Sequence, residues 1–493
     1  MLNFSARKEN GFALSILICS VVLGTFVRVV NLSGGRFLFP DEYRTLKLNI
    51  NSLFIYLVYK IPIMLLKGVV VYDIVLHSTA FWGVASIILV FLVGKALFNE
   101  KTGSYAALIF SVFGYHVYFS RTGYAAVLQT FLLLGGYYLF LLSRNHGYSA
   151  RKEFASGLLF GSAFLTYAVS YAPIAAFLIM FIVTQRLTGA KTKKIITKSA
   201  VWAGGCLLPL AGLEIICRLQ LFSMLPGSFY SSLLVYQKET AMYAPKSVLT
   251  PLWFFKETFA QGGVWQLGLV ILTFVYCIIS GALKRDDSLL WLFGFIITGY
   301  LIFSSMALLK VHSIFPRKYL FLTPFVCICC AYLLHDLEKK TNEYWIISFL
   351  VVFVAFSFLK CNRIIDSTFK ITPITTWIKQ RRIGKNQIIA SLDLYEKGDS
   401  SISPSAYGDY RLFFNGKINW NKLKALYQKK KYGYLLISGI GAAARVGYYD
   451  KTLKKHKPLM TWPHPYHIHR PWLSNSCNFA LYNLEDFFHP KNE

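Results

Sequence analysis

Apolar segments of membrane-spanning length recur along the first 360 residues of this 493-residue chain. A bilayer's hydrocarbon core of about 30 Å needs about 20 helical residues to cross it. Backbone groups in lipid must be satisfied within the protein, so such segments fold as helices. Charged residues make up only 15% of the chain, well below the proportion in soluble domains. The sequence therefore predicts a polytopic α-helical membrane protein.

The apolar pattern predicts about eleven membrane helices. Their ranges are 11–30, 74–94, 103–119, 124–142, 154–170, 172–185, 199–217, 264–283, 288–309, 319–335 and 344–360. The first run lacks a small-residue cleavage site and is predicted to be an uncleaved anchor. Pro173 leaves open whether the pair between 154 and 185 is joined by a tight turn or is one kinked helix.

Basic residues cluster in alternate short loops, and the positive-inside rule assigns those loops to the cytoplasm. The opposite, extracytoplasmic side receives residues 31–73, residues 218–263 and the tail. The tail is also basic, but long domains are translocated largely regardless of charge. We predict a transmembrane domain over residues 1–360 and a separate extracytoplasmic domain over residues 361–493.

The tail lacks apolar runs of spanning length and alternates between helical and strand patterns. Helices are predicted at 373–382 and 420–431, and strands at 387–394, 432–438 and 478–483. This alternation predicts a small α/β domain.

The formal charge of +29 raises the question of nucleic acid. The basic residues lie between apolar runs and in the tail, and they form no single basic and aromatic face. We therefore predict no nucleic-acid binding. Membrane lipids and phosphate groups are the expected partners of this charge.

The most informative segment is Phe39-Pro40-Asp41-Glu42-Tyr43-Arg44, directly after the first predicted helix. Two carboxylates and a guanidinium at a membrane surface can combine a general base with a phosphate clamp. The alternative is a helix start, because proline and acidic residues suit a first turn. Spacing alone leaves both interpretations open.

Further short motifs follow in order along the predicted membrane part. They are Tyr59-Lys60-Ile61-Pro62-Ile63, then His77, Tyr118-Phe119-Ser120-Arg121 and Phe315-Pro316-Arg317-Lys318-Tyr319, the last followed by Pro324. Together with Asp41-Glu42-x-Arg44, this ordered set resembles the GT-C glycosyltransferases. The similarity is to the branch that contains protein O-mannosyltransferases and lipid A aminoarabinose transferases.

The resemblance implies transfer of a sugar from a polyprenyl-phosphate carrier to an acceptor on the outer face. The acceptor would be a lipid, a glycan or a protein. The family's catalytic base maps to Asp41, with Glu42 as a second catalytic carboxylate. Cations near the departing phosphate would stabilise its developing charge. The implied substrate-binding residues are Arg44, Lys60, Arg121, Arg317, Lys318 and Tyr319.

This sequence departs from the family pattern in several places, one of which is His77, where an arginine is commoner. The usual Lys-Pro-Pro-Leu is Lys60-Ile61-Pro62-Ile63, and Tyr59 replaces an acidic residue found in some members. The second outer loop has no carboxylate, so Glu42 or a residue from 218–263 would supply any second acid. The sequence indicates no particular cofactor and no metal-binding residue. Whether the reaction uses a divalent metal is left open.

Other polar residues have structural interpretations beside functional ones. His77 is expected to be a satisfied interfacial histidine. Glu214 is expected to pair with Arg218 one turn on, with a substrate role as the alternative. Glu239 and Glu257 are expected to be solvated loop charges, with closure of their loop over the site as the alternative. A metal site is the less favoured interpretation of the three histidines His464, His467 and His469.

The predicted function is inverting glycosyl transfer by a membrane enzyme. The alternative is a translocator of lipid-linked sugar or polysaccharide without transfer activity, although no internal repeat supports it. We expect a bacterial inner membrane with the active site facing the periplasm or exterior. The sugar and the acceptor are not determined by the sequence.

Overall fold

The computed structural model describes most of the membrane part and portions of the tail. The described residues are 2–32, 36–37, 65, 71–145, 148–167, 170–187, 191–219, 252–284, 286–308, 316–366, 374, 377–378, 380–383, 387–390, 394–395, 413–414, 417–429, 432–437, 453–462 and 479–488. The chain divides into two compact units: unit 1 comprises Met1–Val30 and Leu48–Ile364, and unit 2 comprises Asn31–Lys47 and Ile365–Glu493.

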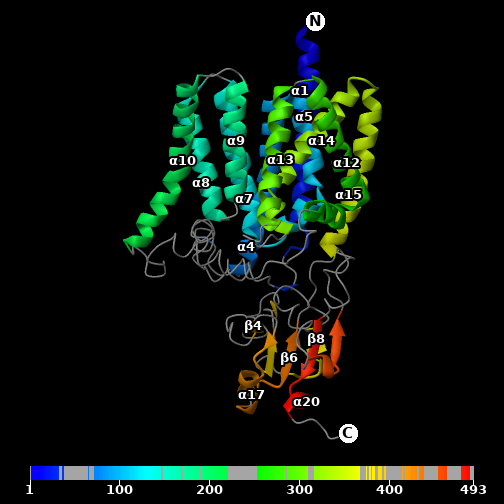
Figure 1. Cartoon of the computed structure of the whole chain (residues 1–493). Coiled ribbons are helices and arrows are strands. Elements are labelled where there is room, and N and C mark those ends of the chain that lie inside the picture. Colours follow the sequence, from blue (N-terminus) through cyan, green and yellow to red (C-terminus); the bar gives the residue numbers. More distant parts are fainter. Residues whose placement is uncertain are drawn as a thin grey trace. The chain divides into compact units, whose positions relative to one another are not determined.

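Unit 1 is a bundle of helices (Figure 1). In chain order they are α1 (Leu2–Val29), α4 (Val71–Leu97), α5 (Glu100–Ser111), α6 (Gly114–Ser120), α7 (Ala125–Asn145), α8 (Ala150–Thr166), α9 (Tyr171–Leu187), α10 (Thr192–Arg218), α12 (Trp253–Lys284), α13 (Asp287–Leu308), the 3-10 helix η4 (Pro316–Tyr319), α14 (Leu322–Glu338) and α15 (Glu343–Asp366). The prediction of a polytopic helical membrane protein is confirmed.

Seven helices among the described residues are long and apolar enough to cross a membrane. They are α1, α4, α7, α10, α12, α13 and α15, and each coincides with a predicted span. The remaining four predicted spans correspond to shorter or interrupted helices. Of these, α8 and α9 are separate, with Pro173 in the first turn of α9, where its missing N–H costs nothing.

Helix α5 lies at the centre of one group of helices, against α1, α4 and α14. Its residues are buried along nearly the whole length, including small polar ones. Ser104 and Ser111 donate their hydroxyl groups to backbone carbonyls, which satisfies them without water. A central helix of this kind needs no lipid-facing side, and this explains its low hydrophobicity.

Aromatic rings join α7, α9, α10 and α13. The ring of Trp291 lies 4.9 Å from Tyr137 and 5.6 Å from Phe177, and Phe177 in turn stacks 4.9 Å from Trp202. Ring pairs at these separations contribute about 0.5–1.5 kcal/mol each beyond their buried area. Contacts between aromatic rings therefore help to hold α7, α9, α10 and α13 together.

Two helices are interrupted. The predicted continuous helix over 103–119 is wrong, because the chain leaves helical geometry at Val112 and Phe113 between α5 and α6. Within α12, Gly263 has φ +79°, a conformation that favours glycine, and it separates residues 253–262 from the long remainder. Both breaks free backbone groups that need other partners.

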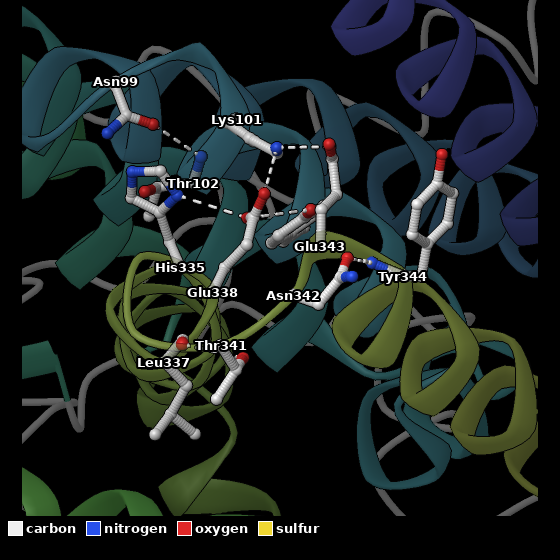
Figure 2. Close-up of polar contacts among 11 residues, drawn as sticks. Asn99, Lys101, Thr102, His335, Leu337, Glu338, Thr341, Asn342, Glu343 and Tyr344 are labelled. Carbon is white, nitrogen blue, oxygen red and sulfur yellow. Dashed lines mark hydrogen bonds and ion pairs between the residues drawn. The ribbon is translucent and has the colours of Figure 1, made fainter.

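At the end where α5 begins, Lys101 lies between the carboxylates of Glu338 on α14 and Glu343 on α15 (Figure 2). The Lys101 Nζ to Glu343 Oε1 distance is 2.6 Å. The Tyr105 hydroxyl also donates to Glu338, at 3.1 Å. This group ties three helices together near their ends.

The pKa of Lys101 is raised. Partial burial alone would lower it, but the hydrogen bonds and charges of Glu338 and Glu343 together outweigh that effect. The folded state therefore holds this proton more tightly than the unfolded chain does. The resulting stabilisation is fully present below the ordinary lysine pKa and is lost as the pH rises through the raised value.

Unit 2 contains a four-stranded sheet with the strand order β2-β6-β8-β7. The strands are β2 (Ile388–Ala390), β6 (Tyr434–Ile437), β8 (Phe479–Asn483) and β7 (Met460–Trp462). β2 and β6 are parallel, with Ile389 opposite Leu435, and the other pairs are antiparallel. Helix α17 (Trp420–Gln428) buries Leu423 in a core with Leu435 and Leu453.

The predicted strands at 387–394, 432–438 and 478–483 and the helix at 420–431 correspond to β2, β6, β8 and α17. The sequence missed β7, whose three residues are too few to show alternation. Two further short pairs join β1 (Arg36–Phe37) to β3 (Leu394–Tyr395), and β4 (Phe413–Phe414) to β5 (Lys417–Ile418). The predicted division into domains at 1–360 and 361–493 stays a prediction. A last short helix, α20, spans Glu485–Phe488.

We predict that Lys101→Ala lowers the free energy of unfolding by about 1–2 kcal/mol, because it leaves the half-buried Glu338 without its cation. Lys95→Ala is the matched control, since Lys95 pairs with Glu100 at an exposed position and should change stability by no more than about 0.5 kcal/mol. Thermal unfolding of the purified protein in detergent measures both. Equal effects of the two substitutions would contradict this account.

Candidate functional site

The predicted site residues fall into three groups. Asp41, Glu42, Arg44 and Lys60 lie outside the described residues. The backbone of Arg317 is described as part of η4, but its side chain is not. Arg121, Lys318 and Tyr319 are described, and all three are buried in unit 1. The structure therefore describes the side chains of three of the predicted site residues.

Buried side chains replace the hydrogen bonds lost at the break between α5 and α6. The guanidinium of Arg28 on α1 donates to the carbonyl of Ser111 at 2.7 Å and to that of Phe110 at 3.3 Å. Gln266 on α12 donates to the carbonyl of Val112 at 2.8 Å, and its side-chain oxygen accepts from the N–H of Gly114 at 3.0 Å. Both side chains are completely buried. They make the break possible in an apolar bundle.

His116 extends this polar group along α6. Its Nδ1 lies 3.3 Å from the Arg28 guanidinium and 3.1 Å from the Ser120 hydroxyl. Arginine can only donate, so Nδ1 accepts and the ring carries its proton on Nε2 when neutral. The Ser120 hydroxyl also lies 2.8 Å from the carbonyl of His116, to which it donates. α6 is thus held in one orientation by α1.

Arg121, directly after α6, lies against the end of α1. Its side chain is 1% exposed, and Nη1 donates to the carbonyls of Val27 at 3.1 Å and Val30 at 2.8 Å. The last carbonyls of a helix lack partners within the helix, and a cation there is favoured by the helix dipole. Arg121 therefore positions the point at which the chain leaves α1 toward Asp41. We call this end of unit 1, where α1 and α6 stop, the exit end.

η4 carries Arg317, Lys318 and Tyr319 and packs against α12. Lys318 is buried, at 4% exposure. The ring of Tyr319 lies 5.6 Å from Tyr300 and 5.7 Å from Phe303 on α13. These ring contacts pack η4 against α13. A buried lysine retains its charge only with a partner.

The expectation that Glu257 is a solvated loop charge is wrong. Glu257 lies in α12 and is 2% exposed. The sequence of residues 218–263 has too few apolar residues to predict a membrane span, and its helical segment over 253–262 is short. Glu239, the other carboxylate considered there, lies outside the described residues.

Other polar predictions have mixed outcomes. The predicted pair of Glu214 and Arg218 is confirmed, with 2.7 Å between Oε1 and Nε. His77 is exposed on α4. Among the described residues no group of three His, Cys, Asp or Glu side chains could hold a metal ion. His464, His467 and His469 lie outside the described ranges.

Sequence analysis missed Arg28 and Gln266. The signal for Arg28 was a lone cation in the predicted first span, since an ionisable residue within a membrane helix indicates a functional or structural partner. Gln266 gave a weaker signal, because a single amide is common in apolar helices. Neither residue could be paired with the break, because the break itself has no sequence marker such as proline.

Comparisons with known proteins identify the fold. No protein-family model matches the sequence, and no curated protein resembles it significantly. The crystal structure of ArnT from Cupriavidus metallidurans in the apo state aligns with a TM-score of 0.59 and 11% identity, over 87% of this chain and 93% of that chain. The same protein bound to undecaprenyl phosphate aligns with a TM-score of 0.53 and 12% identity, over 75% and 73% of the two chains.

The oligosaccharyltransferase of Archaeoglobus fulgidus in the apo form aligns with a TM-score of 0.54 and 12% identity, over 90% of this chain and 72% of that chain. Identities this low establish shared architecture and do not transfer activity. The chain shares the fold of these two proteins.

We predict opposite effects from two leucine substitutions on α12. Gln266→Leu leaves the N–H of Gly114 without its acceptor and leaves the carbonyl of Val112 with only the Cys361 thiol at 3.4 Å, which should cost about 1–3 kcal/mol of unfolding free energy. Gln261→Leu is the matched control, because the Gln261 amide has no hydrogen-bond partner among the described residues and an apolar replacement should be neutral or stabilising. Thermal unfolding in detergent measures both, and equal destabilisation would refute the assignment.

Proposed function

We propose that this protein is a membrane glycosyltransferase that transfers a sugar, with inversion, from a polyprenyl-phosphate carrier to an acceptor hydroxyl on the extracytoplasmic face. The GT-C fold is the observation that carries the proposal. The ordered motifs around Asp41, Lys60, Arg121 and Arg317 support it independently. The proposed setting is a bacterial inner membrane, with the site facing the periplasm or exterior.

The geometry of the exit end supports the placement of this chemistry. Arg121 holds the end of α1, from which the chain continues toward Asp41 and Arg44. η4 brings the backbone of Arg317 and the buried Lys318 to unit 1. Cations placed on rigid elements stabilise a developing phosphate charge without reorganisation.

In the proposed reaction the Asp41 carboxylate accepts the proton of the acceptor hydroxyl as its oxygen attacks the anomeric carbon. The new carbon–oxygen bond forms on the face opposite the phosphate, and the bond from the anomeric carbon to the phosphate oxygen breaks. The electron pair leaves with the polyprenyl phosphate, whose charge is balanced by Arg44, Lys60 and Arg317. A positioned carboxylate base typically raises the reaction rate by about 10² to 10⁴-fold.

The distribution of buried charge favours transfer over the alternative, a lipid-linked sugar translocator. The buried charged side chains among the described residues are Arg28, Arg121, Glu153, Glu214, Glu257 and Lys318. Each lies within about one and a half turns of an end of its helix. A translocator needs polar groups across the bilayer midplane, and none of these six side chains lies near the middle of its helix.

We predict that Asp41→Asn reduces transfer by at least about 100-fold, because the amide cannot accept the proton. Membrane vesicles supplied with polyprenyl-phosphate-linked sugars measure turnover. Asp287→Asn, in the first turn of α13, is the control and should retain activity. The base assignment is abandoned if the Asp41 variant turns over at the wild-type rate while its expression and unfolding temperature are unchanged.

We also predict that Lys60→Ala and Arg317→Ala weaken use of the donor, each by about 10-fold in kcat/KM, because each removes a cation from the leaving phosphate. The substitution of Lys194, an exposed lysine on α10, by alanine is the control. Donor titrations at saturating acceptor measure the effect. Unchanged donor kinetics in both variants would contradict the proposal that Lys60 and Arg317 bind the donor phosphate.

A further inference from the structure

The first part of α12, residues 253–262, has a buried face made mainly of polar side chains. Phe254, Glu257, Thr258 and Gln261 recur at helical spacing and share this face. All four are buried, with Glu257 at 2%, Thr258 at 0% and Gln261 at 1% exposure. Buried helix faces are usually apolar, so a carboxylate and an amide here require an explanation.

Of the carboxylate of Glu257 and the amide of Gln261, the amide is the more informative. Its Nε2 and Oε1 are both buried, and neither has a hydrogen-bond partner among the described residues. Gln266, one and a half turns further along the same helix, uses both of its polar atoms on the backbone of the α5–α6 break. Leaving a buried amide unsatisfied costs about 1–3 kcal/mol. A group retained at that cost is expected to find its partner in a bound ligand.

The surroundings of this face are aromatic and closely packed. A Cβ atom on Gly114 would collide with the backbone carbonyl of Gln261, so α6 and α12 approach closely at this point. The ring of Phe254 lies 5.9 Å from Tyr115 on α6, and Phe255 lies 6.2 Å from Tyr300. Aromatic rings beside directed polar groups suit carbohydrate, whose C–H faces are apolar and whose edges carry hydroxyls.

We infer that Glu257 and Gln261 bind hydroxyl groups of the donor sugar. A carboxylate accepts hydrogen bonds and a carboxamide both donates and accepts, so two groups one turn apart can bind neighbouring hydroxyls of one ring. The donor is favoured over the acceptor because η4, which carries Arg317 and Lys318, packs on α12. This inference rests on the proposed function, in which those cations hold the phosphate that bears the sugar.

The test compares binding of sugar-free and sugar-bearing carriers to the full-length protein in nanodiscs. The probes are undecaprenyl phosphate and undecaprenyl phosphates that carry a hexose, a pentose or an aminopentose. The wild type should bind at least one sugar-bearing carrier about 10-fold more tightly than undecaprenyl phosphate. Gln261→Leu and Glu257→Gln should each reduce that preference about 10-fold, with unchanged affinity for undecaprenyl phosphate.

Two controls separate ligand binding from packing. Gln261→Leu should keep or raise the unfolding temperature while it loses the sugar preference, a combination that a purely structural role does not produce. Lys256→Gln, a partly exposed position on the same segment, should keep the wild-type preference. A preference that survives in both test variants overturns the inference, and so does loss of affinity for undecaprenyl phosphate itself.

Failure of the inference is distinguishable from failure of the proposed function. A wild type that transfers sugar from its donor in vesicles, but whose Glu257 and Gln261 variants discriminate carriers normally, refutes only the hydroxyl site. A wild type that transfers nothing and binds none of the four carriers refutes both.

Discussion

The break between α5 and α6 depends on hydrogen bonds from Arg28 and Gln266, and the arrangement of the exit end depends on the break. A chain inside an apolar bundle cannot leave helical geometry unless the released carbonyl and N–H groups find new partners. Arg28 supplies donors to Phe110 and Ser111, and Gln266 supplies one donor and one acceptor to Val112 and Gly114. The interruption lets α6 take its own direction, so that Arg121 reaches the end of α1.

Buried polar groups in unit 1 thus differ in what they do, and their hydrogen bonds distinguish them. Arg28, Arg121 and Gln266 are directed at backbone groups and hold the frame. Gln261 is directed at no described partner and lies on the same helix as Gln266. Satisfied groups rigidify a site, whereas an unsatisfied one has capacity left for a ligand. In the proposed function, the polar face of Glu257 and Gln261 contacts the sugar.

Agreement between sequence and structure follows the strength of the local signal. Long apolar runs were predicted correctly as α1, α4, α7, α10, α12, α13 and α15, because the bilayer imposes length and composition on each span separately. The Glu214–Arg218 pair was predictable because it joins neighbours on one helix turn. Glu257 was assigned wrongly to a solvated loop, since α12 packs against elements that are distant in sequence, α6 and η4 among them.

The sequence by itself determined that this is a multi-pass membrane protein with a small α/β tail, and its ordered motifs indicated the GT-C fold. Those properties arise from composition, periodicity and residue order, which are local or sequential. Only the tertiary structure decided that the third predicted span is broken, that Arg28 and Gln266 satisfy the break, and that Arg121 lies on the end of α1. The physical reason is that a backbone hydrogen bond lost in one helix is replaced by side chains from others, and no pattern within one segment records which side chain that will be.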